Sequence, residues 1–236
     1  MKLSKPADHA KTTPASASAL QDNLIIATLK NHPGSDIFNI LRTKVLSKMN
    51  ANNWNVLAVT SPRANAGKSF TASNLAISIA MGENHSALLA DFDFRRPSVH
   101  RYFGITSPKG LSDFVYGDVP LAELLIRPNI KRLALLPAGK QTTGSLELLS
   151  SHKLLNLLKE LKSRYSDRII VIDLPPLLDT ADALAFLPNA DACLLVVPEG
   201  ECTVDDIKQS MQLIDKNKLL GSVLNKSTET ASHIYY

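Results

Sequence analysis

The sequence predicts a doubly wound α/β fold, in which helices cover both faces of a mainly parallel β-sheet. Two observations carry this prediction. Six short apolar runs recur along the chain, and amphipathic segments with helical spacing separate most of them. The runs are apolar throughout and do not alternate between apolar and polar residues, which is typical of strands buried on both sides.

Each element follows from its own pattern. The apolar runs NVLAVT, SALLAD, RLALLP, RIIVID, ACLLVV and GSVLN predict strands at residues 55–60, 86–91, 132–137, 168–173, 192–197 and 221–225. Helical spacing predicts helices at residues 68–82, 145–164, 178–187 and 203–216. A further helix is expected to begin at Ser35 or Asp36, where a capping side chain follows Pro33-Gly34. Its apolar stripe implies docking on a neighbouring surface.

The chain has the size of one α/β domain, with 236 residues. Residues 1–22 are rich in Ser, Thr, Ala, Pro and Lys without periodicity, which predicts a flexible leader. We expect residues 23–226 to form the single domain and residues 227–236 to form a flexible tail. No stretch approaches the roughly 20 apolar residues that a membrane helix needs, and the N-terminus lacks the apolar centre of a signal peptide. We therefore expect a cytosolic chain unless a partner holds it elsewhere.

Composition excludes several classes of function. The net charge is +4, but Lys and Arg are scattered and only 6% of residues are aromatic, which disfavours a nucleic-acid surface. Of the two cysteines, Cys193 falls within a predicted buried strand, so a structural thiol is expected instead of a disulfide or a metal pair with Cys202. No two of the six histidines have metal-ligand spacing. No metal site built from His or Cys is predicted.

Ligands of open parallel sheets bind at the carboxyl ends of the strands. The first such junction is SPRANAGKS, between a predicted strand and a predicted helix. There the backbone N–H groups and the positive end of the helix would face a phosphate, Lys68 would reach the outer phosphates, and Ser69 could hold magnesium. Pro62 stands where the usual phosphate loop begins with glycine. A chance Gly-Lys-Ser is common, but the flanking strand and helix favour the anion site.

The second junction is DFDFRRP, which places Asp91 at a strand end and Asp93 two residues later. The two carboxylates can point into one crevice if the chain bends there, and Arg95-Arg96 could balance phosphate charge. Taken alone, the same residues are equally compatible with a solvated charged turn.

The third junction is DLPPLLDTADAL, with Asp173 at the end of the most apolar strand. A buried carboxylate is costly unless it is hydrogen-bonded or lies near a cation, and magnesium held through water is the usual cation beside a phosphate loop. Asp182 is expected on an exposed helix near the same crevice. A capping role is realistic for Asp179 and Asp182 and poor for Asp173. The order of the three junctions indicates a magnesium-nucleoside-triphosphate site.

These motifs resemble those of the bacterial tyrosine kinases of the cytoplasmic, capsule and exopolysaccharide type, from about residue 24 to the C-terminus. In that family, the first phosphate loop (Walker A) contains Pro and Gly-Lys-Ser/Thr without a strict first glycine, as in residues 61–69. The second motif (Walker A′) ends Asp-x-Asp-x-Arg-Arg-Pro, as in LLADFDFRRP, and the third (Walker B) ends Asp-x-Pro-Pro, as in IIVIDLPP. The resemblance implies a P-loop NTPase fold like that of the deviant-Walker ATPases.

The resemblance also implies the roles of individual residues, with ATP and Mg²⁺ as cofactors. Lys68 would bind the β and γ phosphates, and Asp91 would assist deprotonation of the attacking tyrosine, whose phenol has a pKa near 10. Ser69 and Asp93 would hold magnesium, with Asp173 supporting it through water. Nucleotide-binding residues would be Ala64, Asn65, Ala66, Gly67, Lys68, Ser69, Phe70 and, at the adenine, Asn225. A helix- or turn-capping role is nearly as compatible with Asn225.

In this family the phosphoacceptors are C-terminal tyrosines, which here would be Tyr235 and Tyr236. An ordinary polar tail that ends in aromatic residues is the alternative. Related kinases often carry Glu-x-x-Arg-x-x-Arg as a subunit contact, and here Asp36, Asn39 and Arg42 occupy these positions, so the middle arginine is missing. The resemblance implies a homo-oligomer, a separate transmembrane activator or chain-length-determinant protein, and possible protein substrates in polysaccharide synthesis. It places the chain at the inner face of the cell membrane through its partner.

The competing hypothesis is a non-kinase switch, similar to the deviant-Walker partition and septum-placing ATPases, which dimerises on ATP and controls a partner. Those proteins carry a signature lysine five residues before the Walker lysine, where this chain has Arg63. Arg63 lacks the flanking glycines of that signature loop. An iron–sulfur scaffold on the same fold is disfavoured, because the sequence has no paired-cysteine motif.

Overall fold

The computed structural model describes residues 11–12, 24–29, 32–106, 108–164 and 167–228. Within these residues, eight strands form one sheet in the order β1-β4-β5-β3-β6-β2-β7-β8. All neighbouring pairs are parallel except β4 and β5. In that spatial order the strands are β1 (Lys11–Thr12), β4 (Ile126–Arg127), β5 (Leu133–Leu136), β3 (Ser86–Asp91), β6 (Arg168–Asp173), β2 (Val56–Thr60), β7 (Ala192–Pro198) and β8 (Leu219–Asn225). The predicted mainly parallel sheet is confirmed.

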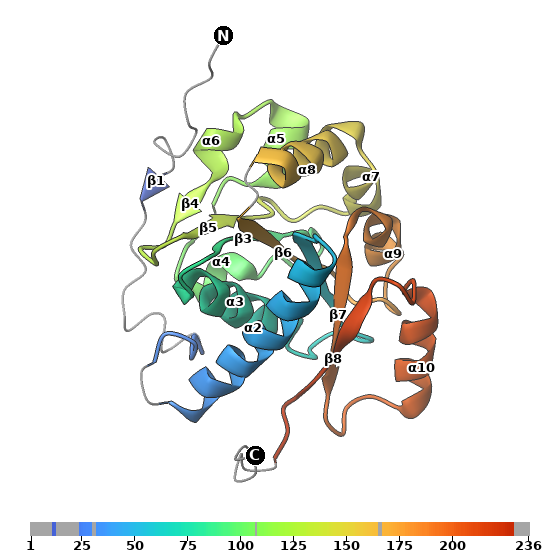
Figure 1. Ribbon diagram of the computed structural model, residues 1–236. Helices are drawn as coiled ribbons and strands as arrows, with labels where there is room; N and C mark the ends of the chain where they lie inside the picture. The colour runs from blue at the N-terminus through green and yellow to red at the C-terminus, as the bar shows by residue number, and fades with distance from the viewer. Residues whose placement is uncertain (1–10, 13–23, 30–31, 107, 165–166, 229–236) are drawn as a thin grey trace.

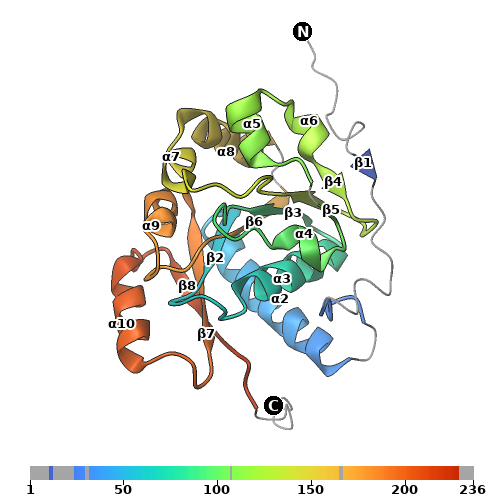
Figure 2. The same cartoon turned by 180° about the vertical axis from the view of Figure 1, so that it is seen from behind.

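Helices cover both faces of the sheet, as predicted (Figures 1 and 2). One face carries α2 (Pro33–Ala51), α3 (Lys68–Met81) and α4 (Val99–Tyr102), whose apolar side chains form one buried cluster with the sheet. A second cluster lies on the other face. The elements packed there are α5 (Leu111–Gly117), α6 (Leu121–Leu124), α7 (Ser145–Leu149), α8 (His152–Arg164), α9 (Asp182–Phe186), the short 3₁₀ helix Leu187–Asn189 and α10 (Val204–Leu213).

The central strands contribute to both clusters because successive residues of a strand point to opposite faces. In β2, Val56 and Ala58 lie in one cluster, whereas Leu57 and Val59 lie in the other. The same division holds in β6, where Ile170 and Ile172 face α8 and α9. This arrangement explains why the strands are apolar at every position. Cys193 is fully buried in β7, and burial raises the pKa of its thiol to about 12.

Helix α2 begins earlier than predicted. His32 caps its first turn by accepting the Gly34 N–H at its Nδ1 atom (3.0 Å), and Pro33 occupies the first helical position, where no N–H is needed. A capping role for Ser35 or Asp36 was therefore wrong. The expected docking of the helix is confirmed, since Phe38, Val45 and Met49 are buried in the cluster shared with α3.

Several boundaries on the other face also differ from prediction. The predicted helix 145–164 is divided into α7 and α8, because Ser150 turns its hydroxyl back to the Leu146 carbonyl (2.8 Å) where the first helix ends. The predicted helix 178–187 begins only at Asp182. The short elements α4, α5, α6 and β4 were not predicted, because each has too few residues to show a period. Of the predicted leader, only Lys11–Thr12 is described, so the proposed boundaries at residues 22 and 227 stay predictions.

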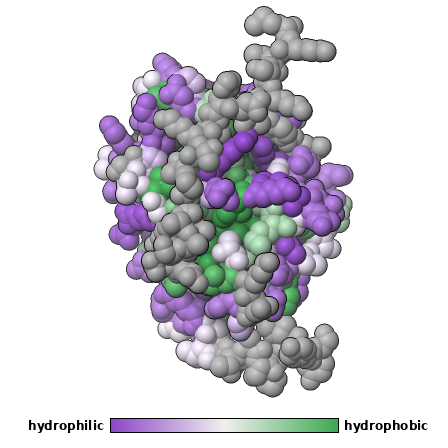
Figure 3. Space-filling model, turned by 90° about the vertical axis from the view of Figure 1, so that its left-hand side faces the viewer, coloured by the Kyte–Doolittle hydropathy of each residue, from purple (hydrophilic) through white to green (hydrophobic). Residues whose placement is uncertain are grey.

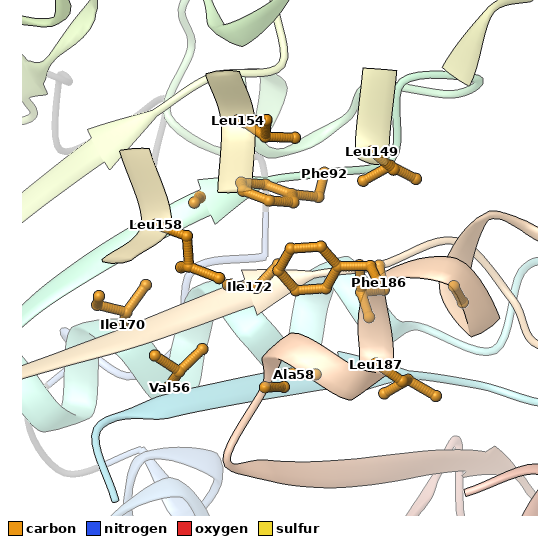
Figure 4. Close-up of a cluster of buried hydrophobic side chains, with 14 of the residues drawn as sticks. Val56, Ala58, Phe92, Leu149, Leu154, Leu158, Ile170, Ile172, Phe186 and Leu187 are labelled. Atoms are coloured by element: carbon orange, nitrogen blue, oxygen red, sulfur yellow. The ribbon is translucent and has the colours of Figure 1, made fainter. Parts of the chain in front are cut away.

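The core beside α8 and α9 is built around two phenylalanines (Figure 4). The rings of Phe92 and Phe186 meet edge to face, with 4.8 Å between their centroids, and both are essentially buried. Leu154 and Leu158 of α8 pack in the same cluster as Ile172 of β6. Phe92 directly follows β3 and lies between Asp91 and Asp93, so this packing fixes the chain between the two acids.

At the edge of the sheet formed by β1 and β4, apolar surface lies between hydrophilic side chains (Figure 3). Among the residues that the structure describes, no helix is both long and apolar enough to cross a membrane.

Replacing Phe186 by alanine tests the role of the aromatic pair. Phe186→Ala removes a fully buried ring and leaves a cavity, so the free energy of unfolding should fall by about 3–5 kcal/mol in urea titrations. The control is Leu146→Ala, at a residue of α7 that is 38% exposed, where the change should stay within about 0.5 kcal/mol. A loss below about 1 kcal/mol in the Phe186 variant would show that the core does not depend on this pair.

Candidate functional site

The three junctions predicted from the sequence lie side by side. Strand β6 is placed between β3 and β2, and all three strands run parallel. Asp91 at the end of β3 is in register with Asp173 at the end of β6, and Asp173 is in turn in register with Val59 of β2. The segments that follow these strands therefore leave the sheet together at the carboxyl ends of the strands, where ligands of open α/β sheets bind.

The loop between β2 and α3 needs a left-handed backbone at only two positions. Asn65 (φ 64°) and Gly67 (φ 86°) have positive φ values, whereas Pro62 does not. Pro62 contributes its carbonyl oxygen, which accepts the Leu178 N–H (3.1 Å), and the Ser61 carbonyl accepts the Leu177 N–H (2.9 Å). The loop is thus held against the segment after β6, and the position of Pro62 does not require glycine.

Gly67 is the N-cap of α3 and lies against Asn225. The Asn225 Nδ2 atom donates a hydrogen bond to the Ala66 carbonyl (2.9 Å), and a Cβ atom at Gly67 would lie 2.0 Å from the same nitrogen. Only glycine combines the left-handed backbone with this close approach. Asn225, at the end of β8, therefore supports the loop from behind.

A cluster of buried charges lies directly beyond the loop. The Lys68 Nζ atom is 2.8 Å from Asp93 Oδ2, and the two side chains are only 13% and 3% exposed. The Ser69 hydroxyl donates to Asp173 Oδ2 (2.5 Å) and accepts from the Ser98 hydroxyl (2.9 Å). The other oxygen of Asp173, Oδ1, is buried without a hydrogen-bond partner among the described residues.

One lysine in this cluster faces three carboxylates, and the pKa values of Lys68, Asp91 and Asp173 are shifted. Burial raises the pKa of Asp173 to about 6, against the opposing effects of Lys68 and Ser69. Burial and the Asp173 charge raise the pKa of Asp91 to about 8. Burial alone would lower the pKa of Lys68, but the carboxylates of Asp173, Asp93 and Asp91 outweigh it and raise that pKa above its usual value. The lysine is therefore charged, and this buried cluster of one lysine and three carboxylates, taken without the arginines of the cavity wall, carries excess negative charge.

Asp91 has a different environment from Asp93. Its Oδ2 atom accepts the backbone N–H groups of Ser98 (2.9 Å) and Val99 (3.0 Å), and its Oδ1 atom accepts that of Asp93 (3.1 Å). The side chain is fully buried. In this conformation Asp91 holds the chain that turns from β3 into α4.

A cavity of about 600 Å³ opens at the carboxyl ends of β2, β3 and β6. The phosphate loop, the segment from Asp93 to Tyr102 and the residues from Pro175 to Thr180 line it. Four cations reach this cavity, namely Lys68, Arg95, Arg96 and Arg101. Its size suits a nucleotide, and its charge suits a polyanion.

The residues present fit a magnesium ion with phosphate. Ser69, Asp93 and Asp173 supply only oxygen atoms, which Mg²⁺ prefers, and the unpartnered Asp173 Oδ1 atom is available to a metal-bound water. Across the described part of the chain, no group of three or more His, Cys, Asp or Glu side chains is arranged to hold a metal by itself.

Asp182 is not the exposed helix residue that was expected. It is 1% exposed, and it accepts bonds from Arg95 Nε (2.8 Å), Arg95 Nη2 (3.2 Å) and the Ser145 hydroxyl (2.5 Å). The prediction of an exposed position was wrong because α9 begins at Asp182 and this first residue points inward. Asp182 therefore fixes Arg95 at the wall of the cavity and joins it to α7 and α9.

Asp179 connects two loops and does not cap a helix. Its carboxylate accepts the Ala64 N–H (2.9 Å) and lies 3.1 Å from Arg63 Nη1. Arg63 also pairs with Asp206 of α10 (2.9 Å). The guanidinium at the signature-lysine position is thus engaged within its own chain.

The structure separates the predicted site residues into two groups. Ala64, Asn65, Gly67, Lys68, Ser69 and Asp93 line the cavity. Ala66 is buried, the Phe70 ring packs on Phe38 with 5.7 Å between centroids, and Asp91, Asp173 and Asn225 lie behind the lining. Tyr235 and Tyr236 lie outside the described residues.

Sequence reasoning missed four residues that line the cavity, namely Ser98, Arg101, Tyr102 and Thr180. The first three follow Pro97 on the short helix α4 or at its start, with spacing that places them on one side. Burial raises the pKa of the Tyr102 phenol, and the Asp173 charge adds to that shift. Their position directly after the Arg-Arg-Pro sequence was the signal that could have revealed them, because α4 is too short to show a helical period.

The fold and the three strand-end motifs are those of P-loop ATPases of the deviant-Walker kind. The structure of the septum site-determining protein MinD from Pyrococcus horikoshii, complexed with Mg-ADP, shares this fold. Its TM-score is 0.61 at 23% identity, and the match covers 75% of this chain and 72% of that one.

Within that class, the chain is similar to bacterial tyrosine kinases. Tyrosine-protein kinase YwqD of Bacillus subtilis is 29% identical over 223 residues, or 93% of each chain. The putative tyrosine-protein kinase CapB of Staphylococcus aureus is 28% identical over 206 residues, which cover 86% of this chain and 89% of that protein. No protein-family model matches the chain.

Solved structures of such kinases are similar over nearly the whole chain. The chimerical protein CapA2B2 has a TM-score of 0.81 at 27% identity, covering 92% of this chain and 93% of that one. The kinase domain of Escherichia coli tyrosine kinase ETK has a TM-score of 0.80 at 25% identity, covering 96% and 92%. The resemblance to the capsule and exopolysaccharide tyrosine kinases is confirmed.

Substitution of Gly67 tests the close approach to Asn225. Gly67→Ala places a Cβ atom where the Asn225 amide lies, so that amide must shift and its hydrogen bond to the Ala66 carbonyl is lost, and the affinity for ATP, measured by calorimetry, should fall at least tenfold. Gly200→Ala is the matched control, because Gly200 also has a positive φ (71°) but no atom within 4 Å of a Cβ. Equal ATP affinities in the two variants would contradict this steric explanation.

Substitution of Asp182 tests the anchor of Arg95. Asp182→Ala leaves the buried Ser145 hydroxyl and the Arg95 guanidinium without their acceptor, which should lower the free energy of unfolding by about 1–3 kcal/mol. Glu123→Ala, at an exposed acid of α6, should change it by less than about 0.5 kcal/mol. Denaturant titrations of both variants measure the difference, and a neutral Asp182 variant would remove the proposed anchor.

Proposed function

We propose that this protein is an ATP-dependent protein-tyrosine kinase that phosphorylates C-terminal tyrosines of its own kind and regulates polysaccharide polymerisation or export. The observation that carries the proposal is the convergence of Lys68, Ser69 and Asp93 on one cationic cavity. The proposal is supported by the similarity of 80–93% of the chain to proteins named tyrosine-protein kinases.

The residues of the chain account for binding and orientation of the nucleotide. The N–H groups of the loop and the N-terminus of α3 would hold the phosphates, and Lys68 would exchange Asp93 for the outer phosphates. Arg95, held by Asp182, would face the transferred group from the cavity wall. Bound magnesium, held by Ser69 and Asp93 and supported by Asp173, would supply neutralisation of phosphate charge.

Asp91 is proposed to receive the proton of the attacking phenol. Its raised pKa of about 8 suits a group that exchanges protons near neutral pH. To meet a substrate, the carboxylate must leave the N–H groups of Ser98 and Val99. The assignment therefore includes a movement of the chain between β3 and α4.

Tyr235 and Tyr236 are the proposed acceptors. Strand β8, which precedes them, ends at Asn225 beside the Ala66 carbonyl. The chain that leads to the tail thus leaves the sheet at the carboxyl ends of the strands, beside the phosphate loop. Residues 227–236, proposed as the tail, would bring a tyrosine to the cavity of a second copy.

A homo-oligomer and a membrane partner belong to the same proposal. Of the residues at the subunit-contact positions, Asp36 is exposed, whereas Arg42 donates to the Ser78 carbonyl (2.8 Å) and Asn39 accepts the Ser78 hydroxyl (3.1 Å). Asn39 and Arg42 thus attach α2 to α3, and Asp36 is the residue available to a neighbouring subunit.

We propose that a separate transmembrane activator keeps the chain at the inner face of the cell membrane and that proteins of polysaccharide synthesis are further substrates.

The competing switch hypothesis has less support, because Arg63 is paired with Asp179 and Asp206 within the chain. A switch ATPase would bind ATP, dimerise and release phosphate equally well after deletion of Tyr235-Tyr236. A kinase would lose its acceptors in that variant. Comparing phosphate release and phosphotyrosine content before and after the deletion separates the two functions.

Phosphate mapping with and without Lys68 tests the proposal. Incubation with labelled ATP and magnesium, with the activator's cytoplasmic tail added, should place phosphate on Tyr235 or Tyr236, as read by mass spectrometry. Lys68→Met removes the cation that holds the outer phosphates, so transfer should fall at least a hundredfold, while circular dichroism shows an intact fold. Lys131→Met, at an exposed lysine outside the cavity, is the control.

Two results would contradict the proposal. Absence of phosphotyrosine, with ATP shown to be bound by calorimetry, would exclude the acceptor tyrosines. Persistent phosphotyrosine in the Lys68→Met variant would show that the site of transfer lies elsewhere.

A further inference from the structure

A second cavity, of about 320 Å³, lies next to the nucleotide cavity. Its lining comes from α4, from the chain that enters α5 and from the loop after β5. Arg101 lines both cavities, so the two are neighbours along the segment that follows Asp93.

Close backbone contacts build the walls of this second cavity. The N–H groups of Leu111 and Ser112 donate to the carbonyls of Pro137 (2.9 Å) and Ala138 (2.8 Å), and the Lys140 N–H donates to the Ser112 hydroxyl (2.9 Å). At Gly110, a Cβ atom would lie 2.2 Å from the Pro137 carbonyl oxygen. The Thr142 N–H, two residues after Lys140, donates to the Phe94 carbonyl (3.0 Å) and connects this wall to the nucleotide site.

The lining is cationic, and its cations are unpaired. Arg101, Lys109 and Lys140 are exposed, and none of them forms an ion pair with a described residue. The lining acid is Asp113, whose Oδ2 atom already accepts the Gly110 N–H (2.8 Å). Three positive charges against one negative charge leave a local excess of two.

His100 adds an unsatisfied polar group to this lining. Its Nδ1 atom is buried without a hydrogen-bond partner among the described residues. Burial and the neighbouring Arg101 lower the pKa of the imidazole, so the ring is neutral at physiological pH. Three unpaired cations and an imidazole nitrogen without a hydrogen-bond partner among the described residues favour an anionic ligand.

We propose that this cavity is a substrate subsite, which binds an aspartate or glutamate side chain a few residues from the tyrosine that enters the nucleotide cavity. The inference rests on the proposed kinase function and names the class of its further protein substrates, in which acidic residues flank the tyrosine. An extended peptide advances about 3.3 Å per residue, so neighbouring cavities are within reach of residues a few positions apart. Arg101, shared by both cavities, lies where such a peptide would cross.

Peptide binding to the full chain tests the subsite directly. Two fluorescein-labelled peptides are compared by anisotropy, one with a central tyrosine flanked by aspartates and one with asparagines at the same positions. Each exposed ion pair contributes little and several act together here, so the acidic peptide should bind on the order of five to ten times more tightly. In the double variant Lys109→Ala/Lys140→Ala, this preference should fall to about one- to twofold.

The controls separate the subsite from the nucleotide site and from general charge. Lys109 and Lys140 do not line the nucleotide cavity, so the affinity for ATP should be unchanged in the double variant. Lys131→Ala removes an exposed lysine that lines neither cavity and should keep the full preference. An equal preference in the wild type and the double variant, or no preference in the wild type, would overturn the subsite.

Phosphate transfer from ATP, measured on the same samples, distinguishes failure of the subsite from failure of the proposed function. Transfer to the chain's own tyrosines without a preference for acidic peptides would leave the kinase and remove the subsite. A Lys109- and Lys140-dependent preference without transfer to any tyrosine would leave the anion-binding cavity and remove the kinase.

Discussion

The site depends on one buried interaction, the pairing of Lys68 with carboxylates at the ends of two neighbouring strands. Asp93 contacts the lysine directly, and Asp173 influences it from the end of β6. Burying such charges is costly unless each is compensated. Here a single lysine faces Asp91, Asp93 and Asp173, and a divalent cation can neutralise the negative charge that remains. The carboxylates and the lysine therefore fit the magnesium-nucleotide that we propose as the ligand.

The surrounding structure keeps these charges in place. Asp91 binds three backbone N–H groups of the chain that follows, Asp182 anchors Arg95, and Asn225 supports the phosphate loop. These contacts come from β3, α9 and β8, which lie far apart in sequence. The second cavity is continuous with this framework through Arg101. A substrate bound there would meet the nucleotide across the same short segment.

The sequence was sufficient to predict the sheet, both helical layers and the convergence of three junctions, because each depends on apolar runs and on residues at strand ends. It misplaced Asp182, since burial of a helix-start acid depends on a partner, Arg95, that lies 87 positions away. It missed Arg101 and Tyr102 because a four-residue helix shows no clear period. The environment of Asp91 likewise depends on how the chain turns after β3, which strand and helix patterns do not determine.

The dependence of ATP affinity on magnesium tests the central claim most directly. If the carboxylates around Lys68 are organised for a metal-bound nucleotide, millimolar Mg²⁺ should lower the Kd for ATP at least tenfold in the wild-type chain. In the Asp93→Asn variant, which keeps the size of the side chain but removes its charge, Mg²⁺ should change that Kd by less than about twofold. An unchanged magnesium dependence in the variant would contradict the account, because the metal would then bind without the residue that Lys68 holds.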